Sequence, residues 1–233
     1  MARDLATVKV CAFDMFGTLF DVYSVVRACQ DAFGAEGEEF NRTWRRKHLE
    51  YSWLRALMGR YVPFFELLQN SLDATLVRFG RAGDHALRQR LLESYKVVRP
   101  FQDAAGALDA LAKTGLKRVI LTNGSRDMLT SVLNEAGFAD KFDALFSVAD
   151  VATFKPHPMV YEMAQVRLGV AREEILMVSA HQWDLAGAIS YGFQGVWVDR
   201  PGGGGERENL GFPPDYRITG LDGLAALLSK DQA

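Results

Sequence analysis

A short apolar stretch near the N-terminus, residues 8–20 (VKVCAFDMFGTLF), constrains the fold of this chain more than any other. Its first half is rich in β-branched and aromatic residues, which predicts a buried strand. Asp14 stands where that strand should end, and Gly17 and Thr18 break the pattern soon afterwards. Open α/β sheets present reactive groups in this way, at the carboxyl end of a strand. An aspartate here could equally cap a following helix, so Asp14 alone does not decide the function.

Beyond residue 100 the sequence alternates between strand-like and helix-like segments. The predicted strands are 117–121, 144–148, 175–179, 194–198 and 216–218, and the predicted helices are 103–113, 127–135, 158–168, 184–191 and 221–228. This alternation predicts an α/β fold with a doubly wound, Rossmann-like parallel sheet and helices on both faces.

Residues 21–99 follow a different pattern, because apolar residues recur there every three or four positions and no strand is predicted. The predicted helices are 23–33, 38–58, 64–79 and 84–97. We therefore expect an α/β core of residues 1–20 and 100–233, with an all-helical cap subdomain of residues 21–99 inserted after the first strand. Such a cap would close a small, water-poor cavity over the sheet. The glycine-rich stretch 202–205 predicts a loop.

Composition excludes several classes of partner. The chain is 48% apolar and 24% charged, as ordinary globular proteins are. A net charge of −2 gives no electrostatic reason to expect nucleic acid or a membrane surface. No apolar run reaches membrane-spanning length. Two cysteines are too few for a disulfide framework, and the N-terminal segment resembles neither a signal nor a transit peptide. We expect a cytoplasmic protein with no nucleic-acid or membrane partner.

Polar side chains follow the predicted core strands at the point where each strand ends. Each has an ordinary explanation by itself, as a helix cap, a surface lysine or a packing residue. Because the carboxyl ends of parallel strands meet at one edge of a sheet, their joint occurrence predicts a single reactive crevice. In chain order these residues are Asp14, Thr122, Asn123, Lys155, Ser179, His181, Trp183 and Asp184.

This order of residues resembles the motifs of the haloacid dehalogenase superfamily, over essentially the whole chain. The resemblance implies that Asp14 is a nucleophile and that Thr122, Lys155 and Asp184 belong to the three later motifs. Most members of that superfamily are magnesium-dependent phosphatases, with a second aspartate two residues after the nucleophile and an acidic pair in the fourth motif. Here Phe16 occupies the first of these positions, and Asp184 is a lone acid. These residues suit Mg²⁺ poorly and leave phosphoryl transfer without charge compensation.

Longer segments, including some in the cap, resemble the type II (S)-2-haloacid dehalogenases. They are FDMFGTLFDVYSVV (13–26), TWRRKHLEYSWLRALMGRYV (43–62), LTNGS (121–125), FKPHPMVY (154–161) and WDLAGA (183–188). The resemblance implies hydrolysis of short (S)-2-haloalkanoic acids to (R)-2-hydroxyalkanoic acids through an ester on Asp14, without metal or other cofactor. It also implies a homodimer. A departing halide needs no proton, which fits Phe16 in place of a general acid.

The resemblance also assigns the remaining site residues. The implied catalytic residues are Asp14, Thr18, Lys155, His181 and Asp184. Arg45 is expected to receive the halide together with Asn123 and Trp183, since a guanidinium is a weakly hydrated cation. The implied substrate- and halide-binding residues are Phe16, Arg45, Leu49, Phe64, Thr122, Asn123, Tyr161, Ser179 and Trp183, and no metal ligand is implied.

Two residues depart from the pattern of the resembled enzymes. His181 stands where they usually carry asparagine, and it could act as a base whose activity falls below about pH 6.5. Arg46 stands where they often carry glutamine, and it could reshape the halide side of the pocket. Two alternatives stay open, a magnesium-dependent phosphohydrolase and a catalytically silent homologue that binds small acids. The preferred halogen stays open as well.

Overall fold

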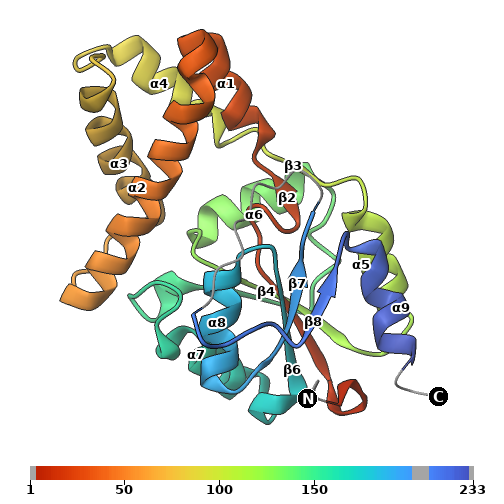
Figure 1. Ribbon diagram of the computed structural model, residues 1–233. Coiled ribbons are helices and arrows are strands. Elements are labelled where there is room, and N and C mark those ends of the chain that lie inside the picture. The colour runs from red at the N-terminus through yellow and green to blue at the C-terminus, as the bar shows by residue number, and fades with distance from the viewer. Residues whose placement is uncertain (1–3, 201–209, 231–233) are drawn as a thin grey trace.

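The chain folds around a parallel sheet, described by a computed structural model for residues 4–200 and 210–230. Within these residues six strands lie in the order β5-β4-β1-β6-β7-β8, with every neighbouring pair parallel (Figure 1). The predicted α/β fold is confirmed. The strands are β1 Val10–Phe13, β4 Lys117–Thr122, β5 Ala144–Ser147, β6 Ile175–Ser179, β7 Gln194–Val198 and β8 Tyr216–Ile218.

The strand order reverses around β1. The chain passes from β1 to β4 and β5 on one side, and then crosses to β6, β7 and β8 on the other. In open α/β sheets the crevice that binds ligands lies outside the carboxyl ends of the strands at such a reversal. Asp14 follows β1 directly, and its backbone N–H donates to the carbonyl of Val178 in β6 at 3.0 Å. The sheet therefore fixes the backbone of Asp14 at the reversal.

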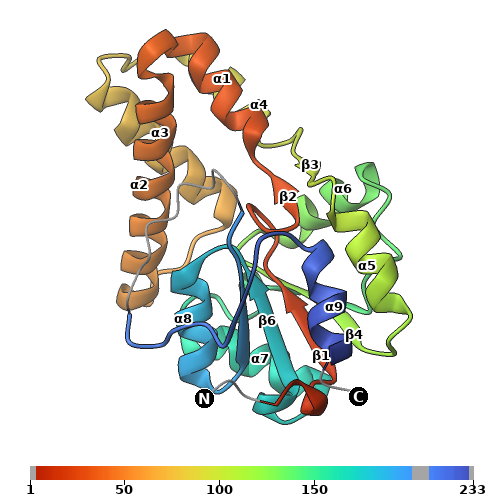
Figure 2. The same ribbon diagram turned by 45° about the vertical axis from the view of Figure 1, so that its right-hand side comes forward.

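Helices cover both faces of the sheet. Cys11 and Phe13 of β1 belong to the apolar layer under α5, α6 and α9, whereas Val10 and Ala12 belong to the layer under α7 and α8 (Figure 2). Burial on both faces explains why the core strands are almost continuously apolar. These helices are α5 Ala104–Ala112, α6 Arg126–Glu135, α7 Pro158–Leu168, α8 Gln182–Tyr191 and α9 Asp222–Lys230.

The helices between β2 and β3 pack around an apolar core of their own, above the sheet (Figure 1). Trp44 lies at its centre, fully buried, with its ring against those of Phe40 and Tyr95. Its indole Nε1 donates to the carbonyl of Leu68 at 3.2 Å, which joins two of the helices. These helices are α1 Tyr23–Phe33, α2 Gly37–Met58, α3 Phe64–Arg78 and α4 His85–Ser94.

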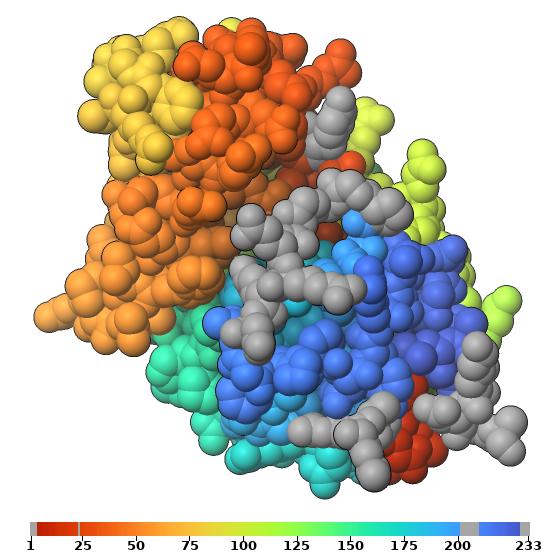
Figure 3. All heavy atoms as spheres, viewed as in Figure 1, coloured from red at the N-terminus to blue at the C-terminus, as the bar shows by residue number. Residues whose placement is uncertain are grey.

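The helices α1 to α4, called the cap below, contact the rest of the chain along one side of the molecule (Figure 3). Where the chain enters and leaves it, β2 Phe20–Asp21 pairs antiparallel with β3 Arg99–Pro100. Beyond α2, the ring of Tyr61 lies 5.1 Å from that of Phe154 in the core, centroid to centroid. Leu67 of α3 joins the apolar layer under α7 and α8. The cap is thus attached at both ends.

The prediction that residues 21–99 contain no strand is wrong at its two ends, because Asp21 and Arg99 belong to the β2–β3 pair. A two-residue strand has no local periodicity, and its partner lies far away in the sequence. The proposed division into core and cap remains a prediction. The predicted loop 202–205 lies outside the described residues. None of the helices in the described part of the chain is long and apolar enough to cross a membrane.

Candidate active site

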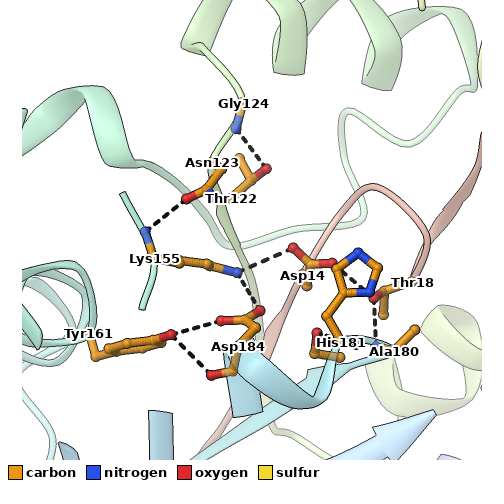
Figure 4. Close-up of polar contacts among 11 residues, drawn as sticks. Asp14, Thr18, Thr122, Asn123, Gly124, Lys155, Tyr161, Ala180, His181 and Asp184 are labelled. Atoms are coloured by element: carbon orange, nitrogen blue, oxygen red, sulfur yellow. Dashed lines mark hydrogen bonds and ion pairs between the residues drawn. The ribbon is translucent and has the colours of Figure 1, made fainter. Parts of the chain in front are cut away.

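Three buried charged groups meet at the carboxyl ends of β1 and β6 (Figure 4). The ammonium of Lys155 lies 3.2 Å from Oδ1 of Asp14 and 2.7 Å from Oδ2 of Asp184. Lys155 and Asp184 are inaccessible to solvent, and Asp14 is 7% exposed. The hydroxyl of Tyr161 lies 2.9 Å from Oδ1 of Asp184, on the side away from Lys155. Both carboxylates therefore share one cation, and Asp14 alone reaches the crevice.

Burial and the attraction between the charged side chains together decide which of these residues carry a proton. Burial by itself would lower the pKa of Lys155, but the carboxylates of Asp184 and Asp14 outweigh it and hold that pKa above its usual value. Burial also raises the pKa of Asp184, an effect that the ammonium of Lys155 opposes. Burial, followed by the Asp184 carboxylate, raises the pKa of Tyr161 well above its usual value. Lys155 is thus charged, and Tyr161 keeps its hydroxyl proton.

Thr18 fixes the second oxygen of the Asp14 carboxylate. The Thr18 hydroxyl donates to Oδ2 of Asp14 at 3.0 Å and accepts from the backbone N–H of Ala180 at 2.9 Å. Because the N–H occupies the acceptor side of the hydroxyl, its proton points to Asp14. Both carboxylate oxygens are therefore held, which fixes the plane of the carboxylate.

The loop after β4 presents a side-chain amide to the crevice. Oδ1 of Asn123 accepts the backbone N–H of Lys155 at 3.0 Å, so the amide group of Asn123 is left as a donor. The hydroxyl of Thr122 accepts the N–H of Gly124 at 3.1 Å, which tightens the same turn. Asn123 and Thr122 both line the crevice.

The cap contributes a cation to the opposite wall. Arg45 of α2 lines the crevice, and within residues 4–200 and 210–230 its guanidinium forms no ion pair or hydrogen bond. Leu49 follows one helical turn later, and Phe64 of α3 stacks on Phe16 at 6.0 Å between ring centroids. An uncompensated guanidinium beside apolar walls is a receptor for a weakly hydrated anion.

His181 lies over the turn that follows Asp14. A Cβ atom on Gly17 would come within 2.8 Å of Cε1 of His181, and Gly17 also has φ +86°, so the turn requires glycine on both grounds. Burial lowers the pKa of His181, and the nearby Asp14 carboxylate offsets this only in part. The value of about 6.5 expected from the sequence is therefore too high for this histidine. The imidazole of His181 is neutral at neutral pH and can accept a proton.

The structure brings the candidate residues together in two groups. A buried group behind Asp14 consists of Thr18, Lys155, Tyr161, Ser179 and Asp184. Ser179 accepts the backbone N–H of His181 at 3.1 Å, so it positions the loop that carries that histidine. The residues that line the crevice are Asp14, Phe16, Arg45, Leu49, Phe64, Thr122, Asn123, His181 and Trp183.

Three further residues line the crevice that the sequence did not indicate: Val22, His48 and Tyr95. Helical spacing could have indicated His48, since it lies three residues after Arg45 on α2. No local signal indicates the other two. The expectation for Arg46 is corrected, because it lines a surface groove on the cap together with Arg42 and Glu50 and is absent from the crevice wall. One residue along a helix turns the side chain by about 100°, away from the face of Arg45.

These residues do not fit the magnesium ion that most of the superfamily uses. Asp184 already has Lys155 on one oxygen and Tyr161 on the other. Phe16 offers no side-chain oxygen, and no three His, Cys, Asp or Glu side chains gather as a potential metal site in the described part of the chain. Mg²⁺ needs several hard oxygen ligands in octahedral geometry.

Comparisons with a family model and with known relatives agree on one family for this chain. Residues 8–192 match the family model of the haloacid dehalogenase-like hydrolases. The chain is 41% identical over 220 residues to an (S)-2-haloacid dehalogenase of Pseudomonas sp. strain YL, covering 94% of each chain. It is 38% identical over 222 residues to haloacetate dehalogenase H-2 of Moraxella sp. strain B, covering 95% of this chain and 98% of that protein.

Among solved structures, an L-2-haloacid dehalogenase of Xanthobacter autotrophicus with covalently bound chloropropionic acid is 37% identical. It superposes with a TM-score of 0.86 over 95% of this chain and 98% of that one. The likeness thus covers almost the whole of this chain, and the family match spans residues 8–192. This chain therefore belongs to the haloacid dehalogenase-like hydrolases and, within them, to the (S)-2-haloacid dehalogenases.

Proposed function

We propose that this protein hydrolyses the carbon–halogen bond of short (S)-2-haloalkanoic acids, giving (R)-2-hydroxyalkanoic acids and halide without a metal ion. The single observation that carries the proposal is the arrangement of charge across the crevice. A carboxylate held on both oxygens, Asp14, faces a wall with an uncompensated guanidinium, Arg45. A fixed carboxylate can attack the substrate carbon, and a free guanidinium on the opposite wall can receive the anion that leaves.

In the first step a carboxylate oxygen of Asp14 attacks C2 of the substrate from the side opposite the halogen. A carbon–oxygen bond forms, the carbon–halogen bond breaks, and the halide leaves with the bonding electrons, which inverts C2. Arg45 receives the halide together with the amide of Asn123 and the ring edge of Trp183. Thr122 and backbone N–H groups after Asp14 hold the substrate carboxylate.

In the second step water attacks the carboxyl carbon of the Asp14 ester. The ester bond from that carbon to the oxygen on C2 breaks, that oxygen ends with the second proton of the water, and the hydroxy acid leaves as the Asp14 carboxylate is restored. His181, neutral and next to the turn of Gly17, is the group that takes the proton of this water. Lys155 supports the charge that develops on the ester oxygen, and Asp184 keeps Lys155 in place.

The test is release of chloride from (S)-2-chloropropionate in the presence of EDTA. We expect release by the unaltered protein, none by Asp14→Asn, and unchanged release by Asp127→Asn, which removes an exposed carboxylate. A single turnover in ¹⁸O-labelled water should place the isotope on Asp14, whereas label found directly in the hydroxy acid would contradict the ester. Phosphate-ester hydrolysis that requires Mg²⁺, with no chloride release, would support the phosphohydrolase instead. Substrate binding without product would indicate a silent homologue.

We further propose that the protein is a cytoplasmic homodimer. Both cysteines are free and buried, which suits a reducing compartment. Leu54, Leu57 and Met58 form an exposed apolar stripe at the end of α2, with Leu57 85% exposed. Such a stripe on the cap is suited to packing against a second copy. Sedimentation of the unaltered protein and of Leu57→Glu tests this, since a dimer through the stripe would dissociate in the variant.

A further inference from the structure

A histidine in the crevice wall has no role in the mechanism above. His48 lies on α2, three residues after Arg45 and next to Leu49, so the three side chains share one face of the helix. All three line the crevice. The ring of His48 packs edge-on against Phe64, 4.6 Å between centroids, and its residue is only 8% exposed. His48 is thus fixed in the wall beside the cation that faces Asp14.

The imidazole of His48 lacks hydrogen-bond partners within the protein. Nδ1 is buried and unpaired, and among the described residues neither ring nitrogen takes part in a hydrogen bond. Buried polar atoms are nearly always paired, and an unpaired one destabilises the fold. Nε2 is likewise unpaired but is not enclosed, so it is the ring nitrogen that a ligand in the crevice can meet.

Charge and chemistry limit what that ligand group can be. Burial and the neighbouring Arg45 guanidinium lower the pKa of His48 to about 4, so the ring is neutral in ordinary buffers. A neutral imidazole carries one N–H donor, and either nitrogen can bear it. The proposed substrate offers acceptors alone, a carboxylate and a halogen. Thr122 and Asn123 stand on the core side of the crevice, whereas His48 stands beside Arg45 on the cap side.

We propose that His48 is a halide-binding and specificity-determining residue, which donates a neutral N–H to the departing chloride or bromide next to the guanidinium of Arg45. The inference rests on the proposed function. A guanidinium supplies charge to an anion of any size, whereas a fixed N–H supplies a directed contact whose strength depends on the halide. His48 therefore adjusts the preference among leaving groups without adding charge to the wall.

Two variants separate this role from packing. His48→Gln keeps a neutral N–H donor, and His48→Leu keeps an apolar side chain of similar length. We expect the inhibition constants of chloride and bromide to rise about tenfold or more in His48→Leu and to stay within about threefold in His48→Gln. Arg46→Gln, which lies in the surface groove on the outer side of the same helix, should leave halide inhibition as it is.

A second measurement needs no turnover. Bound halide raises the melting temperature of the folded protein. We expect sodium bromide, compared with sodium gluconate at equal ionic strength, to stabilise the unaltered protein and His48→Gln but not His48→Leu. In gluconate His48→Leu should melt no lower than the unaltered protein, because it loses an unpaired polar atom. A role in packing would instead lower that melting temperature.

Three results would overturn the inference. They are halide inhibition of His48→Leu equal to that of the unaltered protein, a change that follows alkyl chain length and not the halogen, or a clear loss of stability in gluconate. Release of halide by the unaltered protein in the same preparations shows that the proposed function holds. Failure of that release refutes the proposed function, whereas failure in the variants alone refutes the role of His48.

Discussion

Replacement of Lys155 by methionine tests the charge arrangement on which the site depends. The ammonium is fully buried and lies 3.2 Å from Asp14 and 2.7 Å from Asp184. At an effective dielectric constant of about 20, unit charges at these distances attract by about 5 and about 6 kcal/mol. Desolvation offsets much of this attraction. Removal of one partner from a buried ion pair typically costs about 3–5 kcal/mol of stability.

We therefore expect Lys155→Met to unfold about 6–20 °C lower than the unaltered protein at pH 7, since 1 kcal/mol corresponds to about 2–4 °C in a chain of this size. Loss of the cation next to Asp14 should also slow halide release, by at most about 10⁴-fold if all of the 5 kcal/mol acts on the transition state. The exposed Lys113→Met should change neither quantity.

The pH dependence of this variant has a definite sign. Burial raises the pKa of Asp184, and without Lys155 only the hydrogen bond from Tyr161 opposes that effect. The folded state then binds more protons than the unfolded state above the ordinary pKa of a carboxyl group. Stability of Lys155→Met should consequently rise as the pH falls from 7 to 5, by up to about 1.4 kcal/mol per pH unit. Calorimetry at several pH values measures it.

A double variant makes the test decisive. Lys155→Met combined with Asp184→Asn removes a buried charge of each sign, so it should recover a large part of the lost stability while remaining inactive. The reasoning fails if Lys155→Met has the same melting temperature as the unaltered protein at pH 7, or if Asp184→Asn restores none of the lost stability. In either case the ammonium is not the shared counterion.

Three further variants test the surroundings of this group. Gly17→Ala should lose more stability and activity than Gly115→Ala, since both glycines have positive φ but only the first would clash with His181; equal melting temperatures would refute the contact. His181 acts in the second step, so the pH profile of kcat should stay level at pH 6.5 and fall only at lower pH, because burial lowers the pKa of His181; His181→Asn should remove that fall, and a half-maximum at or above 6.5 would contradict this. Tyr161→Phe removes a hydrogen bond to Asp184, so the free energy of unfolding should fall by about 1.5–3 kcal/mol. Because Tyr161 is outside the crevice wall, kcat should fall more than KM; an unchanged melting curve would contradict the role of this hydrogen bond.

The α/β core could be predicted because its signals are local. Each buried strand is a short apolar run, and the joint occurrence of polar residues after several of these strands indicates a site. Lys155 and Asp14 are 141 residues apart in sequence, yet parallel topology predicts that the loop after β5, which carries Lys155, and the end of β1 lie at the same edge of the sheet. The distances between them, and the sharing of one ammonium by two carboxylates, depend on side-chain packing that no local pattern encodes.

The cap was harder to predict in detail, for the opposite reason. Its helices follow from periodicity, but which residues enter the crevice depends on how α2 rotates against the core. The rotation of α2 places two adjacent residues on different surfaces: Arg45 lines the crevice, and Arg46 lines a surface groove. Tyr95 reaches the crevice from the end of α4, a position defined only once the four cap helices pack. The β2–β3 pair likewise exists only through a partner distant in sequence.

In the proposed mechanism, the positions of the two cations explain why the site would need neither a second acid nor a divalent ion. Lys155 compensates the negative charge while it rests on Asp14, and Arg45 compensates it once it has moved to the halide on the other side of the crevice. In that mechanism, formation of the ester moves negative charge from beside Lys155 to beside Arg45 without a proton transfer, so no acid is needed at the position of Phe16. A phosphate monoester would bring close to two negative charges and spread more over the transferring group, against a single uncompensated guanidinium. The same wall that suits a halide is thus one charge short for phosphoryl transfer.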